Sequence, residues 1–256
     1  MNYYIAKVFI RHFLVEIRIN DVPLLKQNVD ADLTAEMPIN YLIERSGHQV
    51  LTLHLYPKLG ELALISGAQC SVEIWRYDGS GPKIIPIEQV CSSSLAVGDA
   101  DKTLPFKYDN KVFLANVSYQ IQRWSDCEEI TDSRKIASEV ASLYQKIGKM
   151  LANKQYEQYL ELVKNRDWAI CTALSLDEDE VNLRNQMLFE CLNEGFVLQP
   201  LKGSKQMHFY ANKRIVTVLD DDMRSALRFQ NEETGEILAI ELFLGIKKGQ
   251  RGLSII

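Results

Sequence analysis

The sequence contains no long apolar run and no surplus of basic residues, and each absence excludes a class of partner. No stretch approaches the roughly 20 apolar residues that a helix needs to cross a bilayer. The amino terminus lacks the charged and apolar pattern of an export signal. The net charge is −5, from 29 Lys and Arg against 34 Asp and Glu, whereas nucleic-acid binding depends on clustered positive charge. We therefore expect neither a membrane nor a nucleic acid as partner.

Cysteine and histidine are both scattered, which argues against a disulfide framework and against a metal centre. The cysteines are Cys70, Cys91, Cys127, Cys171 and Cys191. The histidines are His12, His48, His54 and His208. No Cys-x-x-Cys pair and no zinc-ligand spacing occurs among them. An odd number of unpaired cysteines suits a reducing compartment, so the sequence predicts a cytoplasmic protein without a bound metal.

Motifs for catalysis are missing as well. The chain has no Gly-x-Gly-x-x-Gly, no Gly-x-x-x-x-Gly-Lys and no Gly-x-Ser-x-Gly. Asp99, Asp101 and Asp109 offer oxygen ligands, but they lack the dense alternation and distal glutamate of a calcium loop. We therefore predict no catalytic residue and no cofactor, and we expect that the protein is not an enzyme.

The residues that are present divide the chain into two halves, of which the first is rich in strands. Apolar and polar residues alternate over 15–19, 51–55 and, most clearly, 113–121. Residues 89–111, rich in Ser, Asp and Gly, have the composition of a long loop. Seven or eight short strands separated by turn residues predict an antiparallel β-sandwich domain over residues 1–128.

The second half begins with helices. Apolar residues recur at helical spacing within 133–152, namely Ile136, Val140, Leu143, Ile147 and Leu151. A second helical stretch covers 155–164. A third helix is predicted from Ser175, because Ser175-Leu-Asp-Glu178 has the form of a capping box, and Gly195 is expected to end it.

A run of strands follows these helices. Period-two patterns occur at 196–201, 206–210, 214–219, 226–230 and 237–244, with short connectors between them. We therefore predict an α+β fold, in which the sandwich is followed by a domain at 131–256 with a helix-covered, curved antiparallel sheet.

This order of elements resembles the nuclear-transport-factor-like cone, which is also known from ketosteroid isomerases and polyketide cyclases. The resemblance covers residues 133–256 and implies a pocket between the helices and the concave sheet. The expected lining residues are Phe209, Val216, Val218, Leu227 and Phe229. None of these side chains can transfer a proton. The polar candidates near such a pocket are Tyr156, Tyr159, His208 and Tyr210, and we assign no catalytic role to them.

An acidic triplet, Asp220-Asp221-Asp222, is predicted in a turn between two strands and is followed by Arg224. One interpretation is a solvated turn, because Asp suits turns through its hydrogen bonds to the backbone. The other is a patch that faces a basic partner. Asp220, Asp221, Asp222 and Arg224 are therefore the candidate partner-binding residues.

An acidic chain with two domains and without catalytic motifs resembles bacterial immunity proteins of contact-dependent or type VI secretion toxin systems. That resemblance implies a monomer or homodimer that binds a basic toxin domain and occludes it. One alternative is a small-molecule binder or an isomerase- or cyclase-like enzyme that uses the carboxy-terminal cavity. Another is a carbohydrate- or peptide-binding module on the sandwich, with Trp75, Tyr77 and Trp124 as its available aromatics.

Overall fold

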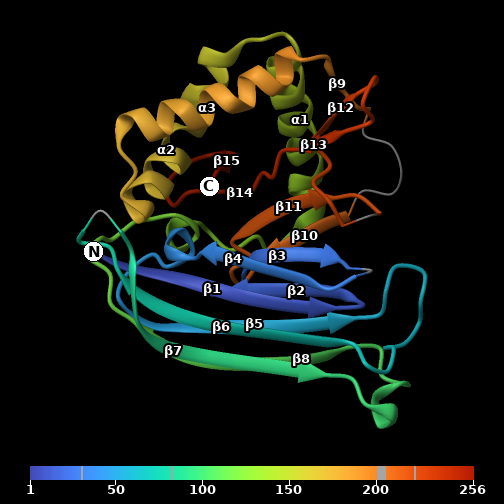
Figure 1. The fold of residues 1–256 in the computed structure, drawn as a ribbon. Helices are drawn as coiled ribbons and strands as arrows, with labels where there is room; N and C mark the ends of the chain where they lie inside the picture. Colours follow the sequence, from blue (N-terminus) through green and yellow to red (C-terminus); the bar gives the residue numbers. More distant parts are fainter. Residues whose placement is uncertain (30, 82, 201–205, 222) are drawn as a thin grey trace. The chain divides into compact units, whose positions relative to one another are not determined.

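The computed structural model describes residues 1–29, 31–81, 83–200, 206–221 and 223–256. The chain forms two compact units, Met1–Ile121 and Gln122–Ile256 (Figure 1). The described strands pair in antiparallel sheets, and three α-helices lie in the second unit. The predicted α+β class is confirmed.

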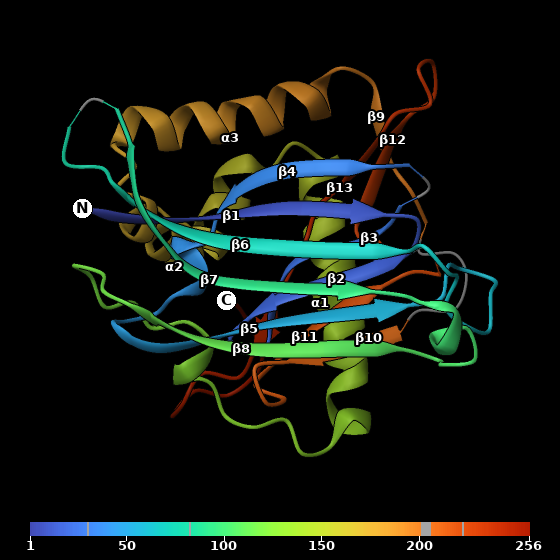
Figure 2. The same cartoon turned by 60° about the horizontal axis from the view of Figure 1, so that its bottom comes forward.

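Two four-stranded sheets build the first unit (Figure 2). One sheet has the order β4-β1-β6-β7, with β4 Leu33–Pro38, β1 Asn2–Arg11, β6 Gln69–Asp78 and β7 Ile85–Ala96. The other has the order β3-β2-β5-β8, with β3 Val22–Asn28, β2 Leu14–Ile19, β5 Gly47–Tyr56 and β8 Lys107–Ala115. Short 3-10 turns occur at η1 Asn40–Leu42 and η2 Asp99–Asp101.

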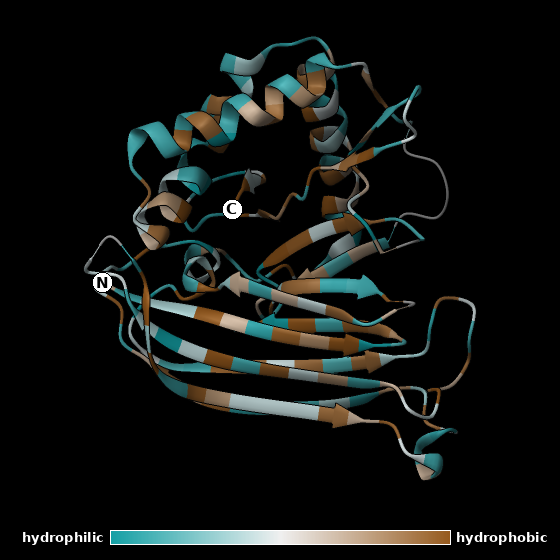
Figure 3. Cartoon of the chain, viewed as in Figure 1, coloured by the Kyte–Doolittle hydropathy of each residue, from teal (hydrophilic) through white to brown (hydrophobic). Residues whose placement is uncertain are grey.

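The core of the first unit follows from the two-residue period of its strands. Buried and more exposed positions alternate along β1, β5 and β6, and in part of these strands the hydropathy alternates with them (Figure 3). The apolar positions are buried, and they include Ala6 and Val8 of β1 and Leu53 of β5. The rings of Tyr4 in β1 and Phe113 in β8 lie 6.5 Å apart, centroid to centroid. Side chains from both sheets therefore share one core.

The expected loop at 89–111 is largely strand. β7 continues to Ala96 and β8 begins at Lys107, which leaves only 97–106 outside the strands. The serines of β7 alternate, with Ser92 and Ser94 exposed and Ser93 buried. The polar composition thus reflects a strand with an exposed face and not irregular backbone, so the predicted loop is wrong for most of its length.

In the second unit, three helices precede two small sheets. The helices are α1 Ser133–Ala152, α2 Tyr156–Leu174 and α3 Glu178–Asn193, and a 3-10 turn, η3 Trp124–Asp126, precedes them. One sheet has the order β13-β12-β9, with β13 Ile237–Ala239, β12 Arg228–Asn231 and β9 Phe196–Leu198. The other has the order β10-β11-β14-β15, with β10 Gln206–Tyr210, β11 Ile215–Leu219, β14 Leu244–Gly245 and β15 Ser254–Ile255.

These strands do not form the single curved sheet that hairpin spacing suggests. β9 pairs with β12, and Phe229 lies opposite Leu198. β10 pairs with β11 instead of with β9. Short connectors specify which consecutive strands form hairpins, but they do not specify which distant strands pair.

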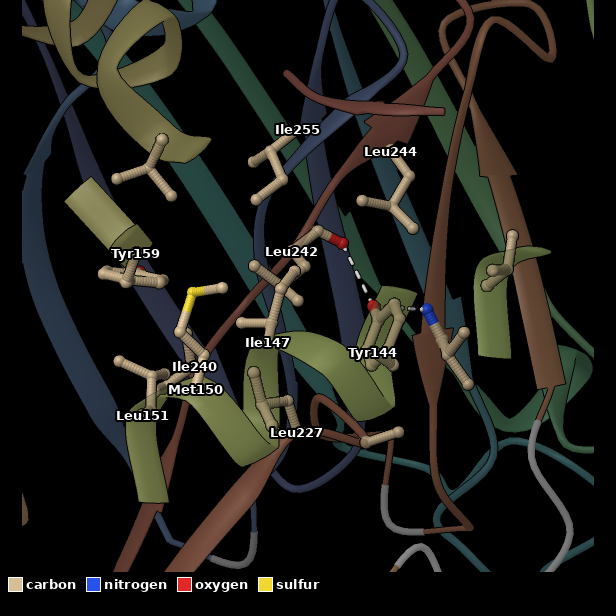
Figure 4. Packing of buried hydrophobic residues seen from close by; sticks show 14 of the residues in the cluster. Tyr144, Ile147, Met150, Leu151, Tyr159, Leu227, Ile240, Leu242, Leu244 and Ile255 are labelled. Carbon is tan, nitrogen blue, oxygen red and sulfur yellow. Dashed lines mark hydrogen bonds between the residues drawn. The ribbon is translucent and has the colours of Figure 1, made fainter. Parts of the chain in front are cut away.

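The predicted stripe of α1 packs against the strands of the second unit. Ile136, Val140, Ile147 and Leu151 are buried, and Leu143 is partly buried against the same cluster (Figure 4). The side chains expected to line an open cone belong to this packed core. Val216, Val218, Leu227 and Phe229 are buried in it, and Phe209 packs against it. The predicted lining is therefore corrected, since four of these five side chains are buried in the core.

Two local boundaries differ from the sequence-based expectation. Residues 122–128 belong to the second unit, where the Glu128 amide donates to the Ile246 carbonyl at 2.7 Å. The division therefore falls after Ile121 and not between 128 and 131. The capping box of α3 is formed by Asp177 and Glu180, while Ser175 ends α2 in a left-handed conformation with φ 50°.

Candidate functional site: the outer face of strands β5 and β8

The outward positions of β5 and β8 form a continuous uncharged surface, which we call the β5–β8 face. It comprises His48, Val50, Thr52, His54 and Tyr56 of β5, Tyr108, Asn110, Val112 and Leu114 of β8, and Phe106 just before β8. The strand register places Val50 opposite Val112, and His54 opposite Tyr108. No residue of this face is Asp, Glu, Lys or Arg.

Large apolar side chains of this face are open to solvent. Tyr108 is 58% exposed, and Val112 and Leu114 are each 63% exposed. β8 is also the last strand of its sheet (Figure 2). Edge strands are usually protected by charged side chains, and contiguous exposed apolar surface usually marks a contact site for another molecule. The β5–β8 face combines an edge, apolar exposure and a lack of charge.

Aromatic rings cluster at one end of the face. Phe106 stacks on Tyr108 with ring centroids 6.1 Å apart, and the His54 ring lies 6.2 Å from that of Tyr108. The Nδ1 atom of His54 is 2.7 Å from the hydroxyl of Tyr56. Burial lowers the pKa of His54, so its imidazole is neutral at neutral pH. This end of the face is therefore uncharged as well.

The same side of this sheet carries charged residues in β2 and β3, where they are paired. Glu16 is 1% exposed, and its carboxylate is 2.6 Å from an Arg18 guanidinium nitrogen and 3.7 Å from the Lys26 ammonium. Arg18 also contacts Asp21 at 2.8 Å. These groups compensate one another locally. The paired charges of β2 and β3 thus lie beside the uncharged and more exposed β5–β8 face.

The predicted acidic turn does not behave as one patch. Asp220 is only 7% exposed, and it accepts from the Arg224 amide at 3.0 Å and pairs with Arg228 at 2.5 Å. Asp220 is thus a structural residue of the turn, since its carboxylate holds two neighbouring segments together. Asp221 and Arg224 are exposed. Asp222 lies outside the described residues.

The aromatics expected to form a carbohydrate or peptide groove are not gathered at the surface. Tyr77 and Trp124 are 7% and 6% exposed. Trp75 is half-buried, and its indole nitrogen donates to Glu73. Two of the tyrosines expected near a cone pocket, Tyr159 and Tyr210, are buried.

The loop carboxylates pair with lysines, and the thiols are free. Asp99 pairs with Lys102, Asp101 with Lys107, and Asp109 with Lys111. All five cysteines lie in the described part of the chain, and none of them is in a disulfide. Burial raises the pKa of the Cys70 thiol to about 12, which makes it a poor nucleophile.

Sequence reasoning missed half of the β5–β8 face. Tyr108 and Asn110 fell in the expected loop, because Asp109-Asn110 has the composition of a turn. The signal was the alternation of Tyr108, Val112 and Leu114 with the inward Phe113. β8 ends at Ala115, so only the first three residues of the strand predicted at 113–121 are in a strand. Extending that pattern backwards from Phe113 would have revealed the missed residues.

Comparison with known proteins gives no relative for this chain. Neither protein-family models, curated proteins nor solved structures yield a match. In the described residues, no helix is both long enough and apolar enough to cross a bilayer.

Proposed function

We propose that this protein is a non-catalytic binding protein whose partner is another protein, and that the β5–β8 face is its docking surface. The observation that carries the proposal is the run of exposed Tyr108, Val112 and Leu114 on the uncharged face of an edge strand. Burying apolar surface contributes roughly 25 cal/mol per Å². Tyrosines at the centre of an interface often dominate its affinity, and charged residues are depleted there.

For the partner, we propose a bacterial toxin domain, which makes the chain an immunity protein that acts by occlusion. The support is the acidic composition, with net charge −5, together with the division of the chain into two units. In this mechanism a rigid sheet face covers the active site of the toxin, while acidic side chains elsewhere accelerate encounter with a basic domain.

The test compares variants of the face with a matched variant elsewhere in the same unit. Tyr108→Thr and Val112→Thr place a β-branched residue, which suits strands, in an exposed strand position, so we expect stability to change by only about 0.5 kcal/mol. Ile85→Thr is the control, because Ile85 is 61% exposed on β7. Proteins retained from native cells by the original chain would be purified and their affinities measured by calorimetry.

We expect each β8 variant to weaken binding at least about tenfold, as loss of an interface tyrosine typically does. The Ile85→Thr variant should bind like the original chain. Equal affinities for all variants would remove the face from the interface. Self-association abolished by Tyr108→Thr, without any other partner, would instead identify the face as a homodimer contact.

The immunity role has a separate test. The purified partner would be expressed alone and with this chain in a bacterial host. We expect growth arrest by the partner, rescue by the original chain and by Ile85→Thr, and no rescue by the Tyr108→Thr/Val112→Thr double variant. A partner that leaves growth unaffected would overturn the immunity role, while the binding role would stand on the calorimetry.

A further inference from the structure

The second unit contains a pocket of about 410 Å³ beside helix α1. Its wall is formed by one side of α1, by the segment that ends β9, and by the two residues that precede β12. This volume lies within the range of small-molecule sites, about 300–1,000 Å³. The pocket belongs to the second unit alone, so it is independent of the β5–β8 face.

The floor of the pocket is apolar and closely packed. Gly148 of α1 faces Leu198 and Leu227, and a Cβ atom at position 148 would lie 3.1 Å from the side chains of both leucines. A side chain at position 148 would therefore require both leucine side chains to shift by a few tenths of an ångström. Ala226 and Leu227, both buried, complete a floor that suits a hydrocarbon chain or ring.

The hydroxyl of Tyr144 is not available to a ligand. It accepts from the Val218 amide at 2.9 Å and donates to the Leu242 carbonyl at 3.1 Å (Figure 4). Burial raises the pKa of Tyr144 to about 12, so the group stays neutral and engaged. Tyr144 thus supplies structure and a ring surface, and the pocket favours binding over proton transfer.

Side chains that can donate hydrogen bonds line the rim of the pocket. Gln145 and Lys149 are exposed and lie one turn apart on α1, and Gln199 lies after β9. Gln145 and Lys149 have no side-chain hydrogen bond or ion pair with any other residue that the structure describes. An ammonium and two amides can all donate to an anionic oxygen.

We propose that this pocket binds a small amphipathic carboxylate, with its hydrocarbon body on the floor of Leu198, Ala226 and Leu227 and its carboxylate at Lys149. The apolar floor selects the body, and Lys149, the one cation among the lining residues that the structure describes, selects the charge. Gln145 and Gln199 add hydrogen bonds to the same oxygens. The site holds a ligand and performs no reaction on it.

The probes are decanoate and its neutral analogue decanol, titrated by calorimetry below their aggregation limits. Lys149→Met removes the charge and keeps most of the apolar stem. Lys146→Met is the matched control, because Lys146 is exposed on the same helix and does not line the pocket. The face variant Tyr108→Thr serves as a second control in the other unit.

We expect saturable binding of decanoate to the original chain and to both controls, and about tenfold weaker binding to Lys149→Met, as for the loss of a charged hydrogen bond. Decanol should bind the original chain and Lys149→Met equally. The absence of saturable decanoate binding, or equal weakening by Lys146→Met, would overturn the proposal. Binding lost in Tyr108→Thr would place the ligand on the β5–β8 face and would also overturn it.

Discussion

At the scale of single residues, Tyr144 shows how one buried polar group can join a helix to strand β11 and to the segment between β13 and β14. Its hydroxyl contacts the Val218 amide, the Leu242 carbonyl and the Thr217 hydroxyl, all within 3.1 Å. Leaving a buried donor without a partner costs more free energy than its hydrogen bond contributes to stability. Removing one partner of these bonds should therefore destabilise the folded protein. The ring itself belongs to the apolar core.

Tyr144→Phe should lower the free energy of unfolding by about 1–3 kcal/mol at neutral pH, because the Val218 amide loses its acceptor. Urea unfolding followed by circular dichroism measures this loss. Tyr3→Phe on β1 is the matched control, because it makes the same phenol-to-phenyl change outside this unit. Leu143→Ala, at a partly buried neighbouring position, would not be a matched control. A Tyr144→Phe variant as stable as the original chain would show that the hydroxyl contacts are dispensable.

The same phenol makes stability depend on pH in the alkaline range. Burial raises the folded pKa of Tyr144 to about 12, while an unfolded tyrosine titrates near about 10. The neutral form is favoured by folding, so this contribution is complete below about pH 10 and is lost as pH rises through about 12. The original chain should therefore lose stability more steeply than Tyr144→Phe between these values. Parallel pH profiles would contradict the assignment.

At the scale of elements, the connection between α2 and α3 shows why capping signals can be assigned two residues out of place. Both Ser175 and Asp177 are good N-cap residues, and each has a glutamate three residues later, at Glu178 and Glu180. In the structure the Asp177 carboxylate accepts from the Glu180 amide at 2.9 Å, and the Glu180 carboxylate accepts from the Asp177 amide at 2.9 Å. Ser175 is instead required to end α2.

Asp177→Ala should destabilise the protein by about 1 kcal/mol, the usual loss for a helix N-cap. Asp179→Ala removes a carboxylate from the same first turn without removing the cap, and it should have a smaller effect through the helix dipole. Denaturant midpoints of the two variants, measured side by side, decide between them. An equal loss for both would mean that charge, and not the cap, is responsible.

At the scale of the whole molecule, each of the two units has its own core and its own sheets. Residues 122–128 complete the second unit. Trp124 and Cys127 are buried there, and the backbone of Cys127 forms an isolated antiparallel β-bridge with that of Lys247. An isolated unit with a packed core and paired strands has what it needs to fold alone.

Fragments 1–121 and 122–256 should each unfold cooperatively when they are produced separately. A fragment that begins at residue 129 should be less stable than the one that begins at 122, because it lacks buried Trp124 and the bond from the Glu128 amide to Ile246. Urea titration of the three fragments is the measurement. Equal stability of the two carboxy-terminal fragments would restore the boundary near 128.

The sequence by itself determined the features that repeat locally. The stripe of α1, the alternation in β2 and β5, and the α+β class all follow from periods of 3.6 and 2 residues, which need no knowledge of distant partners. Tertiary structure alone decided the pairing of β9 with β12, the burial of Asp220 and the exposure of the β5–β8 face. These depend on which segments lie against one another across long stretches of chain, and a local pattern records that a side is apolar but not whether anything covers it.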